Sequence, residues 1–227
     1  MDSILRALQR GQNALSEYDS KQLLSAYGIP VSREGLARSV EEALSLAADL
    51  GFPVVLKACS ADLLHKSDLG GVEIGLKNSL DVQEAYERIV NSIPMPLEGI
   101  LVQEMIRGPR ELVLGLSRDP QFGPCVMFGL GGVLTEIIND TVFRVAPLEM
   151  IDAQEMLLEL RARAVLDPFR GQAAADREMI CRSLIALGRL GLENQLVAEV
   201  DINPMIIAPD GQVKAVDALV ILTDAKQ

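Results

Sequence analysis

The chain has 227 residues, of which 49% are hydrophobic and only 4% aromatic, and its net charge is −11. This length supports one large domain or two smaller lobes with an aliphatic core, and the charge argues against a nucleic acid or an anionic membrane as partner. No apolar run approaches the ~18 residues of a membrane helix, and the N-terminal residues do not resemble a secretory signal. Three scattered cysteines without a CxxC pair indicate reduced thiols, so we expect a cytoplasmic protein.

Helix and strand patterns alternate through the first half of the chain. A helix is predicted from residue 21 up to the stop signals Gly28 and Pro30, and a capping box at 39–42 opens a second helix that runs to Leu50. Strands are expected at 31–37, 53–58 and 72–76, and a further helix at 81–90. Pro94 and Pro96 then indicate a seam between two lobes.

The second half continues the mixed pattern. Strands are expected at 100–106, 111–116 and 125–129, and the last of them ends in a glycine cluster, residues 129–132. Residues 135–146 look extended with a turn at 139–140, two helices fill much of 152–191, and a strand pair spans 196–220. The sequence therefore predicts a two-lobed α+β protein.

The C-terminal strand pair allows a prediction of register. Pro209-Asp210-Gly211 is a typical turn sequence. If these three residues form the loop, Ala208 pairs with Gln212, and counting back along both strands places Asn203 opposite Asp217. A two-residue turn would instead shift the partner of Asn203 by one residue.

Polar side chains gather on one face of this strand pair. Alternation places Glu199, Asp201 and Asn203 on the same face of their strand, and Asp217 lies between apolar neighbours. An amide oxygen beside a carboxylate is a donor pair that Mg²⁺ accepts when nucleotide phosphates and water complete its octahedron. We therefore predict a magnesium site at Asn203 and Asp217, with an ordinary edge hairpin of polar outer face as the alternative.

The segment LLHKSDLGGVEIGL, residues 63–76, combines the only histidine, His65, with Lys66 and the glycine pair Gly70-Gly71. Glycines let backbone N–H groups approach phosphate oxygens, and the lysine supplies positive charge. A neutral imidazole, whose ordinary pKa is about 6.5, is able to accept a phosphoryl group. The loop thus points to phosphate chemistry on His65, while an ordinary surface turn rich in Gly, Ser and Asp stays open on these residues alone.

A set of segments in a fixed order resembles a known family. They are VVLKA, HKSDLGGV, VQEMI, GPRELVLG, FGLGG, FRVAPL, VDINP and AVDALV. Together they resemble the nucleotide-binding half of NDP-forming acyl-CoA synthetases, an ATP-grasp domain similar to the β subunit of ADP-forming acetyl-CoA synthetase and, more distantly, to succinyl-CoA synthetase. The resemblance implies an ATP-grasp fold of two α+β lobes, 18–98 and 99–227, with the nucleotide bound between them and residues 1–17 as an N-terminal extension.

The resemblance also implies roles for individual residues. His65 matches the histidine that is transiently phosphorylated, and Asp201 matches the acid that steadies the phosphohistidine. Asn203 and Asp217 match the Mg²⁺ ligands, in agreement with the strand pairing. The implied nucleotide contacts are Lys57 and Arg144 at the phosphates, Gly70 and Gly71 in a lid loop, Gln103, Glu104 and Met105 at the adenine, and Glu111 at the ribose. For Lys66, Arg107, Arg110, Glu136 and Glu199, a solvated charge or a structural ion pair is an equal alternative.

The implied activity is phosphoryl transfer between His65 and ADP or ATP with Mg²⁺. It would form one half of an ADP-forming acid–CoA ligase, which interconverts acid, CoA and ATP with acyl-CoA, ADP and phosphate. The matched segments include no CoA-binding half, so we expect a CoA-binding α-type subunit or domain as partner in a hetero-oligomer. The alternatives are another ATP-grasp carboxylate ligase, which has no need of His65, and a non-catalytic ATP-sensing module of an acyltransferase.

Overall fold

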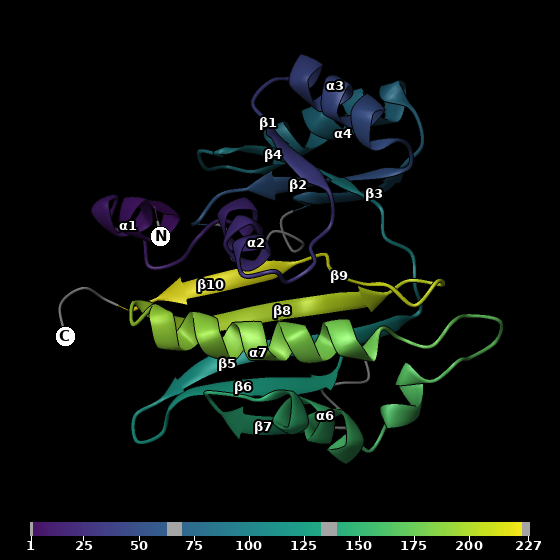
Figure 1. The fold of residues 1–227 in the computed structure, drawn as a ribbon. Helices are drawn as coiled ribbons and strands as arrows, with labels where there is room; N and C mark the ends of the chain where they lie inside the picture. The colour runs from purple at the N-terminus through teal and green to yellow at the C-terminus, as the bar shows by residue number, and fades with distance from the viewer. Residues whose placement is uncertain (1, 63–69, 133–139, 224–227) are drawn as a thin grey trace. The chain divides into compact units, whose positions relative to one another are not determined.

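The computed structural model describes residues 2–62, 70–132 and 140–223, and the chain divides into two compact units (Figure 1). Unit 1 consists of Met1–Leu15, Asp19–Val31 and Ile106–Gln227. Unit 2 consists of Ser16–Tyr18 and Ser32–Met105. Each unit has an aliphatic core of its own, as the composition predicted.

Unit 2 is a four-stranded antiparallel sheet in the order β1-β4-β2-β3, with two helices together on one face (Figure 1). Its elements are β1 (Glu34–Ala37), α3 (Val40–Leu50), β2 (Val54–Cys59), β3 (Val72–Leu76), α4 (Ser79–Ser92) and β4 (Gly99–Glu104). The core between sheet and helices contains Val54, Leu56 and Val102 from the sheet and Ala43 and Val82 from the helices. All the elements predicted for this region are confirmed, with shifts of a few residues at their ends.

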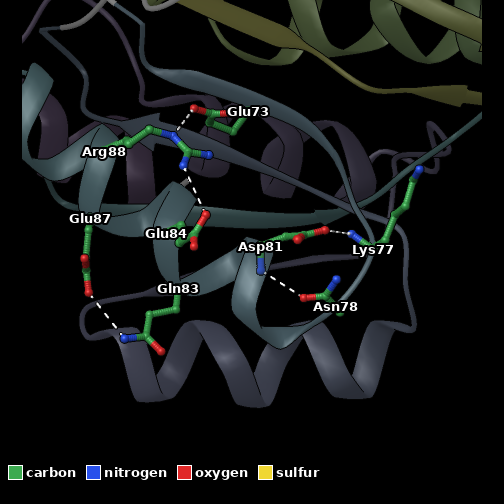
Figure 2. Close-up of polar contacts among 8 residues, drawn as sticks. All are labelled: Glu73, Lys77, Asn78, Asp81, Gln83, Glu84, Glu87 and Arg88. Carbon is green, nitrogen blue, oxygen red and sulfur yellow. Dashed lines mark hydrogen bonds and ion pairs between the residues drawn. The ribbon is translucent and has the colours of Figure 1, made fainter.

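Side-chain caps set where the two helices of unit 2 begin. The Ser39 hydroxyl accepts a hydrogen bond from the backbone N–H of Glu42, as the predicted capping box requires. Asn78 caps α4 in the same way by accepting from the N–H of Asp81, and the Asp81 carboxylate accepts from the N–H of Lys77 (Figure 2). These contacts satisfy N–H groups that the first turn of a helix leaves unpaired.

Strand β3 is bent against β2 and tied to α4. Gly75 has φ +79°, a backbone conformation that side chains disfavour, and the register between β2 and β3 shifts next to it, between Val54 and Val55. Glu73 on β3 pairs with Arg88 of α4 at 2.9 Å (Figure 2). The bulge and the ion pair together fix the strand that follows the His65 loop.

Unit 1 is built on an antiparallel sheet in the order β10-β8-β5-β6-β7, with β9 paired to β8. Its elements are α1 (Asp2–Gln9), α2 (Glu17–Ala26), β5 (Arg110–Asp119), β6 (Gly123–Leu130), β7 (Thr141–Val145), α6 (Met150–Glu159), a 3₁₀ turn (Arg163–Leu166), α7 (Arg177–Glu193), β8 (Val197–Ile207), β9 (Val213–Ala215) and β10 (Ala218–Leu222). Helix α7 runs along the sheet and packs on β5 and β6 (Figure 1). The predicted strands and helices of this region are confirmed, except that residues 135–139 lie outside the described part of the chain.

The predicted register of the C-terminal hairpin is confirmed. The N–H of Ala208 donates to the carbonyl oxygen of Gln212 at 2.8 Å, so the loop has three residues. Met205 then pairs with Ala215, and Ile202 with Ala218. Between these pairs the N–H of Asn203 donates to the carbonyl oxygen of Asp217 at 3.3 Å, so the two predicted metal ligands lie opposite each other.

The unit boundaries differ from the predicted lobes. Helix α1 places Ile4 and Ala7 in the core of unit 1, so the first residues are not a mere extension. The hydroxyl of Ser20 accepts from the N–H of Val220, so α2 joins β10 and unit 1 from Asp19 onward, while its first two residues belong to unit 2. Unit 2 continues to Met105 because β4 pairs with both β1 and β2. In the described parts of the chain, no helix is long and apolar enough to cross a membrane.

Candidate functional site

Lys57 is held on strand β2 by a buried ion pair. Its Nζ lies 2.7 Å from Oε1 of Glu17, and the two side chains are only 8% and 6% exposed. The next residue, Ala58, donates its N–H to the carbonyl oxygen of Gly71 at 2.7 Å. The glycine pair after the histidine loop is therefore anchored beside Lys57, whereas His65 and Lys66 themselves lie outside the described residues.

The other loop glycine, Gly70, has φ +71°, which is left-handed backbone. A side chain at this position would be strained whatever the space around it. The chain thus enters β3 through a left-handed turn that favours glycine, and the lid role of Gly70 and Gly71 stays a prediction.

The three predicted adenine contacts lie at the end of β4. Gln103 is buried, and Glu104 accepts hydrogen bonds from both the N–H and the guanidinium of Arg33 at 2.9 Å. The N–H of Met105 donates to the carbonyl oxygen of Pro53 at 3.4 Å. The chain passes from unit 2 to unit 1 directly after Met105, seven residues beyond the predicted boundary at 98/99, and the adenine contacts stay a prediction.

Glu111 on β5 packs against the second glycine cluster. The N–H of Gly131 donates to the carbonyl oxygen of Glu111 at 2.7 Å. A Cβ on Gly131 would lie 2.8 Å from the carbonyl carbon of Glu111, and one on Gly132 would lie 3.1 Å from its Oε2. Glycine at these two positions therefore lets the segment after β6 lie close to Glu111, the residue predicted to bind the ribose.

Two arginines of unit 1 form ion pairs or hydrogen bonds with other residues of the chain. Arg144 on β7 pairs with Glu159 and, at 3.7 Å, with Glu155 of α6, and the hydrogen bond to Glu159 raises the pKa of Arg144 above its ordinary value. Buried Arg110 donates to the carbonyl oxygens of Val165, Asp167 and Ala173. Of the alternatives left open for Arg110, a solvated charge is thus wrong, and within the described residues its hydrogen bonds go to backbone carbonyl oxygens.

The polar face of β8 carries the predicted acid. Asp201 is partly buried between neighbouring strands, and burial raises its pKa to about 6, with further contributions from Glu199 and Asp217. Val200 and Ile202 on the other face are buried in the core, as the alternation predicted. Because burial and neighbouring carboxylates disfavour its negative charge, this carboxylate is stabilised near neutral pH by a nearby cation or hydrogen-bond donor.

The donor set at Asn203 and Asp217 fits a magnesium ion that is shared with phosphates. Opposed residues of an antiparallel pair have Cβ atoms about 4.5–5.5 Å apart. Among the residues the structure describes, no three His, Cys, Asp or Glu side chains come together as a metal cluster. One amide and one carboxylate are what Mg²⁺ uses when a nucleotide and water supply its other ligands.

Two buried groups near these positions carry no local signal in the sequence and were not predicted. Glu17 was assigned to the extension, yet it pairs with Lys57. Lys21 is fully buried in α2, and its Nζ donates to the carbonyl oxygen of Val216, next to Asp217, at 3.4 Å. Both lie far in sequence from their partners, so no local pattern points to them; their spacing of four residues on α2 is the only shared signal.

Comparisons with known proteins agree on one family. An ATP-grasp domain model matches residues 6–222. The β subunit of acetate–CoA ligase (ADP-forming) I from Pyrococcus furiosus is 39% identical over 224 residues, which cover 96% of each chain.

Solved structures show the same relationship. A structure of dinucleotide-forming acetyl-coenzyme A synthetase 1 from Candidatus Korarchaeum cryptofilum, in complex with coenzyme A, Ca-AMPCP and HgCl⁺, is 47% identical with a TM-score of 0.93, covering 98% of this chain and 99% of that chain. A second structure of that protein holds coenzyme A and Mg-AMPPCP, with its phosphohistidine segment pointing towards the nucleotide-binding site; it is 45% identical with a TM-score of 0.87 over the same shares of each chain.

The predicted ATP-grasp fold is thus confirmed. The chain belongs to the ATP-grasp family, and its close homologues are β subunits of ADP-forming acetate–CoA ligases.

Proposed function

We propose that this chain is the nucleotide-binding subunit of an ADP-forming acyl-CoA ligase. In this role it transfers a phosphoryl group between His65 and ADP, with Mg²⁺, while a CoA-binding partner forms and consumes the acyl-CoA. Three free thiols fit a reducing compartment, so we place the reaction in the cytoplasm.

The observation that supports this proposal best is the opposition of Asn203 and Asp217 on the C-terminal hairpin. The register in the structure is the one that the turn sequence predicts. This register places the oxygen-bearing side chains of Asn203 and Asp217 at opposed positions. Asp201 and Asn203 lie on β8, whose other face is core, and Asp217 lies opposite Asn203 between β9 and β10. Binding of a metal–nucleotide complex accounts for such residues better than a solvated edge does.

The proposed division of roles follows the chemistry of each side chain. Lys57 and Arg144 bring positive charge to the phosphates, and Arg144 must exchange Glu159 for a phosphate to do so. Gly70 and Gly71 offer backbone N–H groups, and Glu111 accepts the ribose hydroxyls. Gln103, Glu104 and Met105 contact the adenine.

In the direction of ATP synthesis, a terminal phosphate oxygen of ADP attacks the phosphorus atom carried by His65. The O–P bond forms as the N–P bond breaks, and the imidazole nitrogen keeps the electron pair of that bond. Asp201 holds the imidazole by accepting a hydrogen bond from its other ring nitrogen. Lys57 and Arg144 balance the charge on the phosphates, which is the main contribution of a protein to such transfers. When bound, Mg²⁺ adds positive charge at the same phosphates.

Calorimetry with the purified chain tests the nucleotide part of this proposal. We expect ADP to bind at least about tenfold more tightly with Mg²⁺ than without it, a difference of about 1.4 kcal/mol. Asp217→Ala should remove most of that difference, because it deletes the carboxylate ligand. Asp167→Ala removes the same charge from an exposed ion pair with Arg177 and should leave the difference intact.

Equal affinity with and without Mg²⁺ in the unmodified protein would contradict the metal assignment. A chain that binds neither ADP nor ATP under any condition would contradict the proposed function as a whole.

A further inference from the structure

Glu17 begins helix α2, and its side chain contacts Lys57 of β2, although the short segment that contains Glu17 is flanked in sequence on both sides by unit 1. Residues Ser16–Tyr18 belong to unit 2, and Oε1 of Glu17 reaches Nζ of Lys57 at 2.7 Å. Both side chains are more than nine-tenths buried, at 6% and 8% exposure. A buried ammonium is thus paired with a buried carboxylate at the lysine that the proposed function assigns to the phosphates.

The surroundings of this pair are poor in water. Cys59 lies two residues along β2, on the same face of the strand as Lys57, and burial raises the pKa of its thiol to about 11. The hydroxyl of Ser16 and the backbone of Tyr18 lower that pKa only in part, while the negative charges of Glu98 and Glu17 raise it further. The charges that act on the Cys59 thiol therefore include Glu98 and Glu17, the carboxylate that also pairs with Lys57.

A lysine in such surroundings keeps its charge only if an anion stays beside it, because desolvation disfavours the ammonium form. Glu17 is that anion. Lysine also carries three N–H donors, so a bond to Glu17 is compatible with a bond to a phosphate oxygen.

We propose that Glu17 is a positioning residue for nucleotide binding: it keeps the Lys57 ammonium charged and fixes its Nζ on β2, where it meets the nucleotide phosphates. This inference rests on the proposed function, and it goes beyond the residues to which that function gives roles.

The first test is the affinity of Glu17→Gln for ADP in the presence of Mg²⁺. Glutamine keeps the size and an accepting oxygen but loses the charge. We expect affinity to fall at least about tenfold, the scale on which a broken buried charge pair acts. Without the Glu17 carboxylate, we expect Lys57 to be neutral in the nucleotide-free variant and to take up a proton when ADP binds. Calorimetry in buffers of different ionisation enthalpy should therefore detect more proton uptake on binding by Glu17→Gln than by the unmodified protein. A purely structural role for Glu17 would not change this proton count.

A double-mutant cycle identifies the group through which Glu17 acts. In the Lys57→Met background, Glu17→Gln should change ADP affinity by less than about twofold, because the cation it supports is gone. Glu17→Asp keeps the charge and should lie closer to the unmodified protein than Glu17→Gln does. The control Glu84→Gln removes a charge from the exposed partner of Arg88 in the same unit (Figure 2) and should leave affinity unchanged.

Each outcome decides between the possibilities. Unchanged or tighter ADP binding in Glu17→Gln overturns the inference, since tighter binding would mean that Glu17 competes with the phosphates. An equal loss in the Lys57→Met background also overturns it, because Glu17 would then act elsewhere. If Glu17→Gln does not fold, the Glu17→Asp variant and the double variant, which has no unpaired charge, provide the comparison. Failure of the unmodified protein to bind nucleotide would instead refute the proposed function.

Discussion

Among single residues, Asp140 shows how backbone donors stabilise a buried carboxylate. Its side chain is 4% exposed, and its oxygens accept hydrogen bonds from the N–H groups of Arg161 at 3.0 Å and Ala162 at 2.7 Å. Burial raises the pKa of Asp140, but the two hydrogen bonds and the Arg161 guanidinium outweigh burial, so the pKa lies below its ordinary value. A carboxyl group whose pKa is lower in the folded than in the unfolded state adds stability above the unfolded pKa of about 4, and this contribution is lost as the pH falls through the folded pKa.

We therefore expect Asp140→Asn to lower the free energy of unfolding by about 1–3 kcal/mol at pH 7, because the amide nitrogen cannot accept and one N–H donor is left unpaired. Urea unfolding at a series of pH values measures this. The difference from the unmodified protein should shrink below pH ~4. Asp167→Asn, at an exposed ion pair, should cost about 1 kcal/mol or less. A difference that stays constant down to pH 3 would contradict this assignment.

The sequence predicted the relative position of residues well where a local pattern determined it. The opposition of Asn203 and Asp217 was predicted because a turn signal fixes the register of both strands, while their role as metal ligands stays a prediction. Glu17 and the backbone contacts of Arg110 were not found, because each depends on chain segments tens of residues away. The roles of Lys57, Glu111 and Arg144 remain predictions, and the structure adds that Lys57 and Arg144 each already have carboxylate partners.

At the scale of elements, Gly131, which follows β6, lies close to the backbone of β5. This close contact is possible only because Gly131 has no side chain. A Cβ there would lie 2.8 Å from the carbonyl carbon of Glu111 and 2.9 Å from the backbone nitrogen of Leu112. Backbone atoms cannot rotate away as a side chain does, so the segments would have to separate. That separation would break the hydrogen bond from Gly131 to Glu111 and displace the Glu111 side chain.

Gly131→Ala should consequently cost about 1–3 kcal/mol of stability, the usual range for overpacking, and should weaken ADP binding as Glu111 moves. Chemical denaturation and calorimetry measure the two effects. Gly115→Ala on β5, the strand that carries Glu111, is the control, because its Cβ would meet the flexible end of Met127 at 3.1 Å and the Val200 carbonyl oxygen at 3.4 Å. Equal stability for the unmodified protein and Gly131→Ala would show that the approach is not tight.

The elements themselves were largely predictable from periodicity, caps and turns. The helix at 40–50 follows from its capping residue Ser39, and the hairpin from its Pro-Asp-Gly turn. Helix α1 was not predicted: it is strongly amphipathic, but its 8 residues make only about two turns, and Ile4 and Ala7 are nevertheless buried. Burial of a short amphipathic helix depends on the partner it packs against, which a local pattern does not contain.

For the whole molecule, strand pairing decides where the units divide. The sequence suggested contiguous lobes on either side of Pro94 and Pro96, which are local signals. The structure instead assigns β4 to unit 2 through its pairing with β1 and β2, and it assigns most of the first 31 residues to unit 1. When a chain passes between two units several times, local signals such as proline residues are not enough to locate the unit boundaries.

The central claim is that His65 carries a phosphoryl group between nucleotide and partner. The most direct measurement is incubation of the purified chain with Mg²⁺ and ATP labelled at its terminal phosphate, followed by mapping of the label. We expect label on His65 that is lost in acid, survives base and returns to ADP when ADP is added, because an N–P bond is labile in acid. His65→Ala should bind nucleotide but take up no label, and no other histidine exists to replace it. Label on Ser67, or labelling that persists in His65→Ala, would contradict the account.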